Sequence, residues 1–585
     1  MSFEARPLRA ISVFLAVVLV FFAIHEAGIA DEKFTVLRVG LLIDGSGREP
    51  VEDAIIVIKG KRIQAVGKES EIQLPQGSQV IHFRNKTAVP GLVDAHAHYR
   101  EWQGEIYLSH GVTSAFDVGD NPLSWRLAQK EGIDKGKILG PRLLTAGRMN
   151  RPAALDTGEG GTRGRTEIYV KDPVQAGVEV ERLAASGVDI IKALEDLTVD
   201  DLRVMSEAAL KTGKRVVAHS INGTEAVLAG VGIHSIEHSH SVALATVTSP
   251  EGRKKLHEAR TRRSNRMTTQ EVHSFMEEDT YEQIIQALVS KNVCWTPTLA
   301  TTWRAFSPQR GRFQTRELKL FSLPGLRYLP PYFRENTQEY FLGTTHLDSE
   351  LLERSQAGYR KLQDFIRGFV KAGGRLQTGS DPNSVLPGLA IHREIELLVE
   401  AGLTPFEALM AATRNPSECA GRGDDFGMIT PGRFADIVIL DANPLQDISA
   451  IERIHMVFKE GQPRRPGYRS DYRNPIPRPA PDRPAPEIEE LTPESVTQGD
   501  GPILLAIKGK NFLGTAVVKL NGKPLPSKVK FRPSRFPQNF RRGTEIEATI
   551  PPELLHRAGT YPVVVEHPGT GGALSNTIYL VVKFR

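Results

Sequence analysis

The chain has 585 residues, of which 24 % are charged and 40 % are hydrophobic. This apolar fraction is enough for large cores, so the composition excludes a wholly disordered chain and a fibrous repeat protein. Lys and Arg number 74 against 69 Asp and Glu, which gives a net charge of +5. Over this length, that small excess predicts no dominant attraction to nucleic acid. At about 150 residues per domain, the length predicts roughly four structural units.

The first thirty residues have the pattern of a secretory signal peptide. Basic residues precede an apolar run over 11–24, and small residues precede a cleavage site after Ala30. We expect cleavage there and export to the periplasm or the medium; an uncleaved segment that anchors the protein in a membrane is the alternative. The two cysteines, Cys294 and Cys419, are too few for a disulfide framework, so we expect a large core to stabilise the exported protein.

The remaining chain changes its hydrophobic period twice. Residues 31–90 contain short strand-like runs separated by Gly, Asp and Pro, and residues 421–462 return to this strand character. Between them, residues 91–420 alternate β-rich runs with helical stretches, which is typical of a parallel α/β sheet. The length of this part favours a closed (β/α)8 TIM barrel. We therefore predict an α/β fold in which the two flanking β segments pair into one small sandwich beside the barrel.

Two further segments follow. Residues 463–486 contain eight prolines and six arginines, which is typical of a semi-rigid, polyproline-like spacer. Binding of proline-recognition modules is the alternative for this segment. Residues 487–585 contain several short strands with turn signals such as Asn521-Gly522, and this pattern predicts an all-β sandwich.

The strongest functional signal lies at the start of the predicted barrel. In the motif PGLVDAHAH (90–98), alternate residues of a strand face the same side, so His96 and His98 present two imidazoles together. Four later strand-like runs each end in another candidate ligand: Lys192, His219, His238 and Asp381. Barrel active sites form at the C-terminal ends of the strands, whereas the barrel core favours branched apolar side chains. The pattern therefore predicts a metal site at the barrel mouth.

This constellation resembles the amidohydrolase superfamily of metal-dependent hydrolases. The segments HGVTSAFDVGD, GPRLLTAGR, VDIIKAL, GIHSIEH, LQTGSD and GRFADIVILDANPLQDI resemble its imidazolonepropionase-related and Xaa-Pro dipeptidase (prolidase-like) branch, over residues 34–462. In that family the flanking β segments form one sandwich beside the barrel. The segment 487–585 resembles an IPT/TIG immunoglobulin-like domain. Such a module binds partners, which the resemblance implies to be envelope components here, or acts as a spacer.

The resemblance implies a site for two divalent ions. The matching positions are His96, His98 and Asp381 for one ion, His219 and His238 for the other, and Lys192 as the bridge. A protonated lysine has no acceptor, and family members solve this with a carbamylated lysine whose carboxylate can bridge both ions. Zinc is the default metal, with manganese or cobalt as alternatives. His273 is the alternative to His238, because it begins a segment that resembles the helix after this ligand.

The implied reaction is hydrolysis of a carbon–nitrogen bond. A hydroxide that bridges two cations is a nucleophile near neutral pH, because the metals lower the pKa of bound water to about 7. Asp381 would take its proton and pass it to the leaving amine. We therefore predict an exported amidohydrolase acting on dipeptides or N-acyl amino acids. The prolidase-like branch often contacts the substrate through a histidine that this chain lacks, so Arg148 or Asn150 is the predicted substrate contact.

Other functions stay open at this point. A lactone, ester or cyclic-amide hydrolase would use the same site, and a non-catalytic envelope binding or adhesion protein would carry a degenerate barrel. Deamination is disfavoured, because nucleobase deaminases usually carry a glutamate three residues after the fifth-strand histidine, where this chain has Asn222.

Two segments look specialised. The basic segment 253–266 has no aromatic residue, so we expect a solvated loop rather than a nucleic-acid site. The aromatic-rich segment 301–360 follows the seventh strand, and we expect a lid that forms part of the substrate pocket. Packing against the barrel rim is the alternative for this segment. His110, His234 and His392 are expected to pack beside the site.

Overall fold

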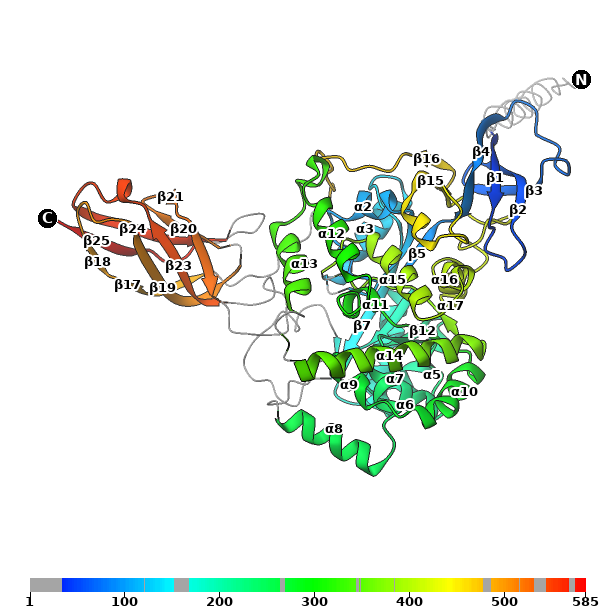
Figure 1. Ribbon diagram of the computed structural model, residues 1–585, viewed down its shortest axis with the longest axis horizontal. Helices are drawn as coiled ribbons and strands as arrows, with labels where there is room; N and C mark the ends of the chain where they lie inside the picture. Colours follow the sequence, from blue (N-terminus) through cyan, green and yellow to red (C-terminus); the bar gives the residue numbers. More distant parts are fainter. Residues whose placement is uncertain are drawn as a thin grey trace, which may run out of the picture.

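The computed structural model describes residues 34–119, 121–151, 168–262, 269–343, 347, 349–382, 384–476, 486–514, 516–530, 543–567 and 574–585. The predicted signal peptide, residues 1–30, lies outside these residues. The described chain forms a helix-covered barrel, a sheet beside it and a C-terminal all-β unit (Figure 1). Within these ranges, no helix has the length and hydropathy of a membrane span.

Eight parallel strands form the barrel. In sheet order they are β5 (Leu92–Ala97), β6 (Val112–Asp117), β7 (Arg142–Asn150), β9 (Ile190–Ala193), β10 (Arg215–Ala218), β11 (Ser235–Glu237), β12 (Cys294–Thr296) and β13 (Arg375–Leu376), while β8 (Ile168–Tyr169) pairs only with β7. Backbone hydrogen bonds from Ala95 N to Thr378 O and from Asp381 N to His96 O, both 2.8 Å, join the first strand to the segment after the last. The predicted TIM barrel is confirmed.

Helices cover the outside of the barrel. They are α2 (Gly104–Ser109), α3 (Leu123–Asp134), α4 (Pro173–Ala185), α5 (Val199–Lys211), α6 (Gly223–Leu228), α7 (His240–Ala245), α8 (Pro250–Arg262), α9 (Thr269–Val272), α10 (Tyr281–Ser290), α11 (Leu299–Thr302), α12 (Arg310–Leu320), α13 (Pro331–Gly343), α14 (Ser349–Lys371), α15 (Leu389–Glu400), α16 (Pro405–Ala411) and α17 (Arg414–Cys419). Local sequence sets several boundaries. Thr198 and Asp201 form a capping box that begins α5, and Thr404 and Glu407 form another that begins α16.

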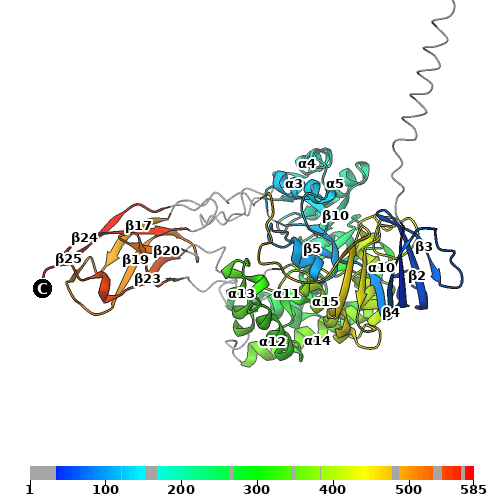
Figure 2. The ribbon, with the colours of Figure 1, turned by 90° about the horizontal axis from the view of Figure 1, so that it is seen from above.

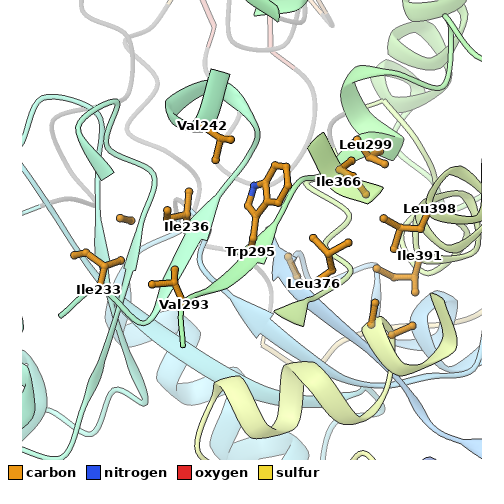
Figure 3. Close-up of a cluster of buried hydrophobic side chains, with 14 of the residues drawn as sticks. Ile233, Ile236, Val242, Val293, Trp295, Leu299, Ile366, Leu376, Ile391 and Leu398 are labelled. Carbon is orange, nitrogen blue, oxygen red and sulfur yellow. The ribbon is translucent and has the colours of Figure 1, made fainter. Parts of the chain in front are cut away.

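Strands β11, β12 and β13 have an outer apolar face and an inner polar one, whereas Val93, Phe116, Leu144, Ile190 and Val217 of the other strands form a separate apolar cluster. Ile236, Trp295 and Leu376 stand on neighbouring strands among side chains of the surrounding helices (Figure 3). The Trp295 ring meets two phenylalanine rings of α14 edge-on, at centroid distances of 5.6 and 5.7 Å. The residues next to these three along each strand point to the other side of the sheet. They are polar and buried, and they hydrogen-bond to one another: Ser235, Glu237, Thr296 and Gln377.

The two β segments that flank the barrel in sequence form one seven-stranded sheet. In sheet order its strands are β16 (Gln462–Arg464), β15 (Ile454–Lys459), β14 (Ile437–Leu440), β4 (Gln79–Pro90), β1 (Phe34–Leu42), β2 (Val51–Lys59) and β3 (Arg62–Lys68). The junction is the antiparallel pairing of β4 with β14, in which Pro90 stands opposite Ile437. Strand β5 begins two residues after β4 ends, so the predicted pairing of the flanking segments also fixes the first barrel strand.

The predicted spacer is partly bound to the barrel. Ser109 Oγ donates to Gly467 O at 2.6 Å, Arg469 N donates to Glu105 at 2.8 Å, and Gln129 donates to Ile476 O at 2.7 Å. The prediction of a spacer is therefore wrong for residues 463–476, because the buried Tyr472 and the half-buried Tyr468 and Ile476 interrupt the proline pattern and dock on the barrel. The stretch 477–485 lies outside the described residues.

The C-terminal unit consists of two sheets that share one apolar core. The first contains β17 (Glu487–Thr492), β19 (Ile503–Phe512), β23 (Gly543–Ile550) and β22 (Ser527–Lys530), and the second contains β18 (Ser495–Thr497), β25 (Ile578–Lys583), β24 (Gly559–Glu566), β20 (Val517–Leu520) and β21 (Lys523–Pro524). Leu505, Val518, Ile546 and Val563 are among the core residues. Figure 2 shows these strands to one side of the barrel. The predicted all-β sandwich is confirmed.

The insertion after β11 is helical rather than a loop. Residues 253–262 of the basic segment belong to α8, so the predicted loop is wrong for this part, and residues 263–268 lie outside the described chain. The segment that begins at His273 starts with two short 3-10 helices, η2 (His273–Phe275) and η3 (Glu278–Thr280), before α10 begins. The described residues also contain the 3-10 helices η4 (Pro324–Leu326), η6 (Ile448–Glu452) and η8 (Pro552–Leu554).

One disulfide connects two distant parts of the barrel. Cys294 at the start of β12 is bonded to Cys419 at the end of α17, with 6.2 Å between their Cα atoms. Both side chains are buried. The disulfide adds to the stability that was expected from the core alone. The pairing could not be predicted, because the two cysteines lie 125 residues apart in the sequence.

Candidate metal centre

The six side chains predicted to bind metal converge at the barrel mouth. Each stands at or after the C-terminal end of its strand: His96 and His98 with β5, Lys192 on β9, His219 after β10, His238 after β11 and Asp381 after β13. The ring centroids of His219 and His238 are 4.2 Å apart, and those of His96 and His238 are 4.6 Å apart. His98 Nε2 lies 3.4 Å from Asp381 Oδ1. The fold thus gathers all of these positions into one cluster.

The floor of the cluster is buried and tightly connected. Lys192 is 1 % exposed, and its Nζ lies 3.1 Å from Nε2 of His96. The other ring nitrogen of His96, Nδ1, contacts the Glu237 carboxylate. Ser235 and Thr296 donate hydrogen bonds to the same carboxylate. Glu237 therefore fixes the ring orientation of His96 and leaves Nε2 facing Lys192, which is the arrangement seen behind metal-binding histidines.

Burial determines the charges in the cluster. The pKa values of His96 and His219 lie well below the ordinary value, first because of burial and then because of the Lys192 charge. Burial and then the neighbouring His219 lower the pKa of His238 in the same way. These imidazoles are therefore neutral at pH 7, the form that binds a cation. Burial also lowers the pKa of Lys192 and raises that of Glu237.

The donor set fits a divalent cation. His96, His238 and Asp381 each offer one ligand atom, and these three atoms all lie within 4.8 Å of one another. Nε2 of His238 is buried and has no hydrogen-bond partner among the described residues. Such an orphaned polar atom is unfavourable unless it binds something. Neutral imidazoles combined with a carboxylate are ligands of zinc and related ions, so the residues present suit the metal that the barrel motif implies.

Three residues other than glycine have a left-handed backbone conformation at this site. His238, Thr298 and Asp381 follow the consecutive strands β11, β12 and β13, and their φ angles are +61°, +51° and +38°. Each such residue other than glycine carries about 1–3 kcal/mol of strain, which persists only where its surroundings enforce it. Gly379 allows the backbone to pass close to a ligand, because a Cβ at this position would lie 2.6 Å from Cβ of His96. The backbone at these strand ends is therefore shaped by the site.

Three residues that support the ligands were not predicted from the sequence. Glu237 contacts His96, and Thr298 Oγ1 lies 2.8 Å from Nδ1 of His238. Asp94 accepts hydrogen bonds from the backbone N of His96 at 3.1 Å and of Ser380 at 2.9 Å, which ties the first strand to the last. Asp94 and Glu237 could have been predicted from the sequence, because each is an acidic residue in an apolar strand and stands within two residues of a predicted ligand. Thr298 had no such signal.

The two predicted substrate contacts behave differently. Arg148 stands opposite Lys192 in the sheet, and its charge helps to lower the pKa of His219. Its Nη1 donates to Val118 O at 3.0 Å. The side-chain amide of Asn150, in contrast, makes two hydrogen bonds with Asp196, at 3.0 and 3.1 Å. Asn150 therefore orders the loop after β9, whereas Arg148 acts electrostatically on the cluster.

Other histidines lie outside the cluster. His273, the alternative sixth-strand ligand, is buried in η2, where its Nε2 lies 2.8 Å from Ser239 Oγ and its ring meets Trp303. The insertion of α7, α8 and α9 separates it from β11. His110 and His392 pack against each other, with ring centroids 5.2 Å apart. His234 accepts a hydrogen bond from the backbone N of Val216 at 3.2 Å.

The aromatic segment 301–360 is built mainly by packing. Trp303, Phe313 and Phe341 are fully buried in the main core, and Phe333 packs edge-on against Trp102 after β5. These aromatic side chains therefore follow the alternative of packing against the barrel rim. The start of the segment still reaches the cluster, since Thr301 Oγ1 donates to the backbone O of Asp381 at 2.9 Å.

Comparison with known proteins agrees with this geometry. The sequence model of the Amidohydrolase family matches residues 334–464. Ochratoxinase from Aspergillus niger is 25 % identical over 472 residues, which cover 74 % of this chain and 87 % of the relative. Among solved structures, a putative prolidase from Bifidobacterium longum has a TM-score of 0.53 at 23 % identity, covering 75 % of this chain and 96 % of that one.

A Xaa-Pro dipeptidase with bound methionine is also similar in structure, with a TM-score of 0.52 at 20 % identity. The match covers 74 % of this chain and 100 % of the dipeptidase chain. At this identity the structural matches establish the fold alone. The family match over residues 334–464 supports the amidohydrolase superfamily, and the prediction of a hydrolase is confirmed. The finer branch and the IPT/TIG resemblance stay predictions.

Proposed function

We propose that the chain is a binuclear-metal amidohydrolase that cleaves the amide or peptide bond of a small substrate, such as a dipeptide or an N-acyl amino acid. The observation that carries this proposal is the cluster at the barrel mouth, in which ligand atoms of His96, His238 and Asp381 lie within 4.8 Å of one another. The similarity to proteins named ochratoxinase and Xaa-Pro dipeptidase supports chemistry on small amide substrates.

The ligands of the proposed site are His96, His98 and Asp381 for one cation, His219 and His238 for the other, and Lys192 between them. Zinc is the default metal. When bound, such cations supply Lewis acidity and make water a nucleophile near neutral pH. Burial lowers the pKa of Lys192, which favours the neutral amine. That amine can add to carbon dioxide, forming an N–C bond and releasing one proton, and the carbamate that results offers the acceptor oxygens that lysine lacks.

The chain itself orients the substrate and carries a proton. The Asp381 side chain is 15 % exposed, so water and substrate can reach the carboxylate beside His98. Asp381 takes a proton from the attacking water and delivers it to the leaving amine. Arg148 presents a positive charge beside Lys192 and His219, which suits a substrate carboxylate. Dipeptides and N-acyl amino acids both carry this carboxylate.

A substrate screen on zinc-loaded protein tests the proposal. Dipeptides, N-acyl amino acids, lactones and phosphotriesters are assayed together with the metal content of each preparation. We expect about two metal ions per chain and turnover of the amide substrates. Turnover confined to lactones or phosphotriesters contradicts the proposed substrate class, and a protein that binds no metal contradicts the proposed site.

We also propose that the protein is exported after cleavage behind Ala30. The disulfide between Cys294 and Cys419 supports this proposal, because such bonds persist in oxidising compartments. The C-terminal sandwich then serves as a spacer or a partner-binding module outside the cytoplasm. Fractionation of the native host and mass spectrometry of the mature N-terminus test the proposal. A cytoplasmic protein that retains residues 1–30 contradicts it.

A further inference from the structure

We propose that residues 298–301, the threonine turn, form a positioning device that holds two of the metal ligands at once and is itself held by Glu394. This inference rests on the proposed metal-dependent function. Thr298 contacts His238, Thr301 contacts Asp381, and Glu394 binds the backbone between them. None of these three residues is one of the proposed ligands, and the turn comes from the strand β12, which supplies no ligand of its own.

The first contact orients an imidazole. Thr298 is fully buried, and its Oγ1 lies 2.8 Å from Nδ1 of His238. With Nδ1 donating to this hydroxyl oxygen, Nε2 keeps its lone pair. Nε2 is the buried atom that has no hydrogen-bond partner among the described residues, and it belongs to the group of three candidate ligand atoms. Thr298 therefore selects the tautomer and the ring orientation that a cation requires.

The second contact fixes a backbone. Thr301 Oγ1 donates to the carbonyl oxygen of Asp381 at 2.9 Å, and Asp381 N donates to His96 O at 2.8 Å. The peptide groups on both sides of the Asp381 Cα are thus held. The carboxylate that serves as ligand and proton carrier therefore projects from a backbone whose position depends on the same turn that orients His238.

Glu394 anchors the turn from the helix α15. Its side chain is fully buried, and its two carboxylate oxygens accept hydrogen bonds from Leu299 N at 2.9 Å and Ala300 N at 2.7 Å. These are the backbone donors that α11 leaves without intrahelical partners. A single carboxylate on a neighbouring helix therefore fixes the position of both threonine hydroxyls.

The backbone angles indicate that the turn is shaped for the ligands. Thr298 has φ +51° and ψ +50°, a left-handed conformation that is a clear outlier for a β-branched residue. The two ligands that the turn contacts, His238 and Asp381, also have positive φ angles. A left-handed position that needs no particular side chain is ordinarily occupied by Gly or Asn. The threonine hydroxyl is retained where the backbone disfavours threonine, which points to a use for the hydroxyl.

Metal affinity tests the proposal without a substrate. The full chain and its variants are titrated with Zn2+ against a chelator, and the melting temperature of each metal-free protein is recorded. We expect Thr298→Val to raise the metal dissociation constant about 10- to 100-fold, because the shape is kept and the hydroxyl is lost. Thr298→Ser restores the hydroxyl, so we expect its affinity to stay within about threefold of the wild type. Glu394→Gln is expected to weaken binding in the same direction.

Thr298→Gly separates positioning from stability. Glycine relieves the left-handed strain, so we expect the metal-free protein to melt at the same or a higher temperature while it binds metal more weakly. A merely structural role would move both quantities together. Thr224→Val is the matched control, because Thr224 is equally buried and its hydroxyl lies 3.0 Å from Ser241 Oγ rather than a ligand.

Three outcomes overturn the positioning role. They are wild-type metal affinity in both Thr298→Val and Thr298→Gly, equal losses in Thr298→Val and Thr224→Val, and a Thr298→Gly protein that loses stability in proportion to affinity. If the wild-type chain itself binds no metal, the proposed function fails together with this inference. Normal wild-type binding with unaffected variants overturns the positioning role alone.

Discussion

The barrel mouth and the C-terminal sandwich differ in whether their polar side chains are buried. At the mouth, Lys192, Glu237 and Asp94 are at most 3 % exposed and contact one another or the histidines. In the described residues of the sandwich, the core is apolar and His567 is the one buried polar side chain. The charged side chains of the sandwich lie on its surface, as in the ion pair between Lys508 and Glu490, whose charged atoms are 3.1 Å apart.

The contrast separates what folding needs from what chemistry needs. Burying a charged or polar group is unfavourable unless partners compensate it, so a domain under no other demand keeps such groups outside, as the sandwich does. The mouth keeps ionisable groups inside and accepts left-handed backbone at three strand ends. Substitutions at the mouth should therefore change metal binding and turnover more than stability, whereas core substitutions in the sandwich should do the reverse.

The largest expected effect is the loss of turnover in Asp381→Asn. The amide keeps the size of the side chain but cannot carry the proton, so we expect kcat to fall by about 100- to 10,000-fold. The melting temperature should stay close to that of the wild type. Steady-state kinetics and thermal unfolding measure the two quantities. Unchanged turnover refutes the role assigned to Asp381, and a collapsed melting temperature breaks the contrast between the two regions.

A core substitution in the sandwich should show the opposite pattern. Leu505 is fully buried, and we expect Leu505→Ala to lower the free energy of unfolding of the sandwich by about 2–5 kcal/mol because it leaves a cavity. Hydrolysis at the barrel mouth should be unaffected. Denaturant titration and an activity assay check both halves of the statement. Lys508→Ala is the surface control, and we expect it to change stability by at most about 1 kcal/mol.

Glu237→Gln should weaken metal binding without destabilising the metal-free protein. Loss of the carboxylate behind His96 is expected to raise the metal dissociation constant about 10- to 100-fold. Burial raises the pKa of Glu237 above its unfolded value, so its stabilising contribution is present at low pH and lost as the pH rises through the folded pKa. At pH 8 the glutamine variant should therefore unfold at the same temperature as the wild type, or at a higher one.

Chelator competition and calorimetry test the Glu237 prediction, with Glu490→Gln on the sandwich as the matched control. A variant that binds metal normally shows that Glu237 does not support the ligand. A strongly destabilised variant shows that its carboxylate serves the fold instead.

The smallest expected effect concerns two buried histidines away from the ligands. Burial lowers the pKa of His110 well below its ordinary value and that of His392 to about 4. Between that folded pKa and the unfolded value of about 6.5, the unfolded state binds more protons, so stability rises with pH and levels off above 6.5. We expect each histidine to contribute at most about 1.4 kcal/mol per pH unit in this window.

Unfolding of His392→Phe and the wild type at pH 7.5 and 5.5 measures this contribution. The variant should lose less stability than the wild type between the two pH values. An equal or larger loss means that His392 is not the titrating group.

The sequence predicted those parts of the fold that depend on local sequence patterns. Strand and helix periods marked the barrel, the flanking sheet and the sandwich, and the strand-end positions of His96, Lys192, His219 and Asp381 indicated the cluster. The spacer and the basic loop were misjudged, because composition does not reveal that Tyr472 docks on the barrel or that residues 253–262 form a helix. Proline and arginine content describes the average chain, whereas docking depends on the surface that it meets.

The sequence by itself determined the ligand types and their order along the chain, because those follow from side-chain chemistry and strand period. Only the tertiary structure decided which groups stand behind the ligands. Thr298 and Glu394 lie 60 and 156 residues from His238 by numbering, and they act together through hydrogen bonds that exist once β11, β12 and α15 are packed. A hydrogen bond requires a distance of about 3 Å, and a distance of that kind between remote residues is a property of the folded chain.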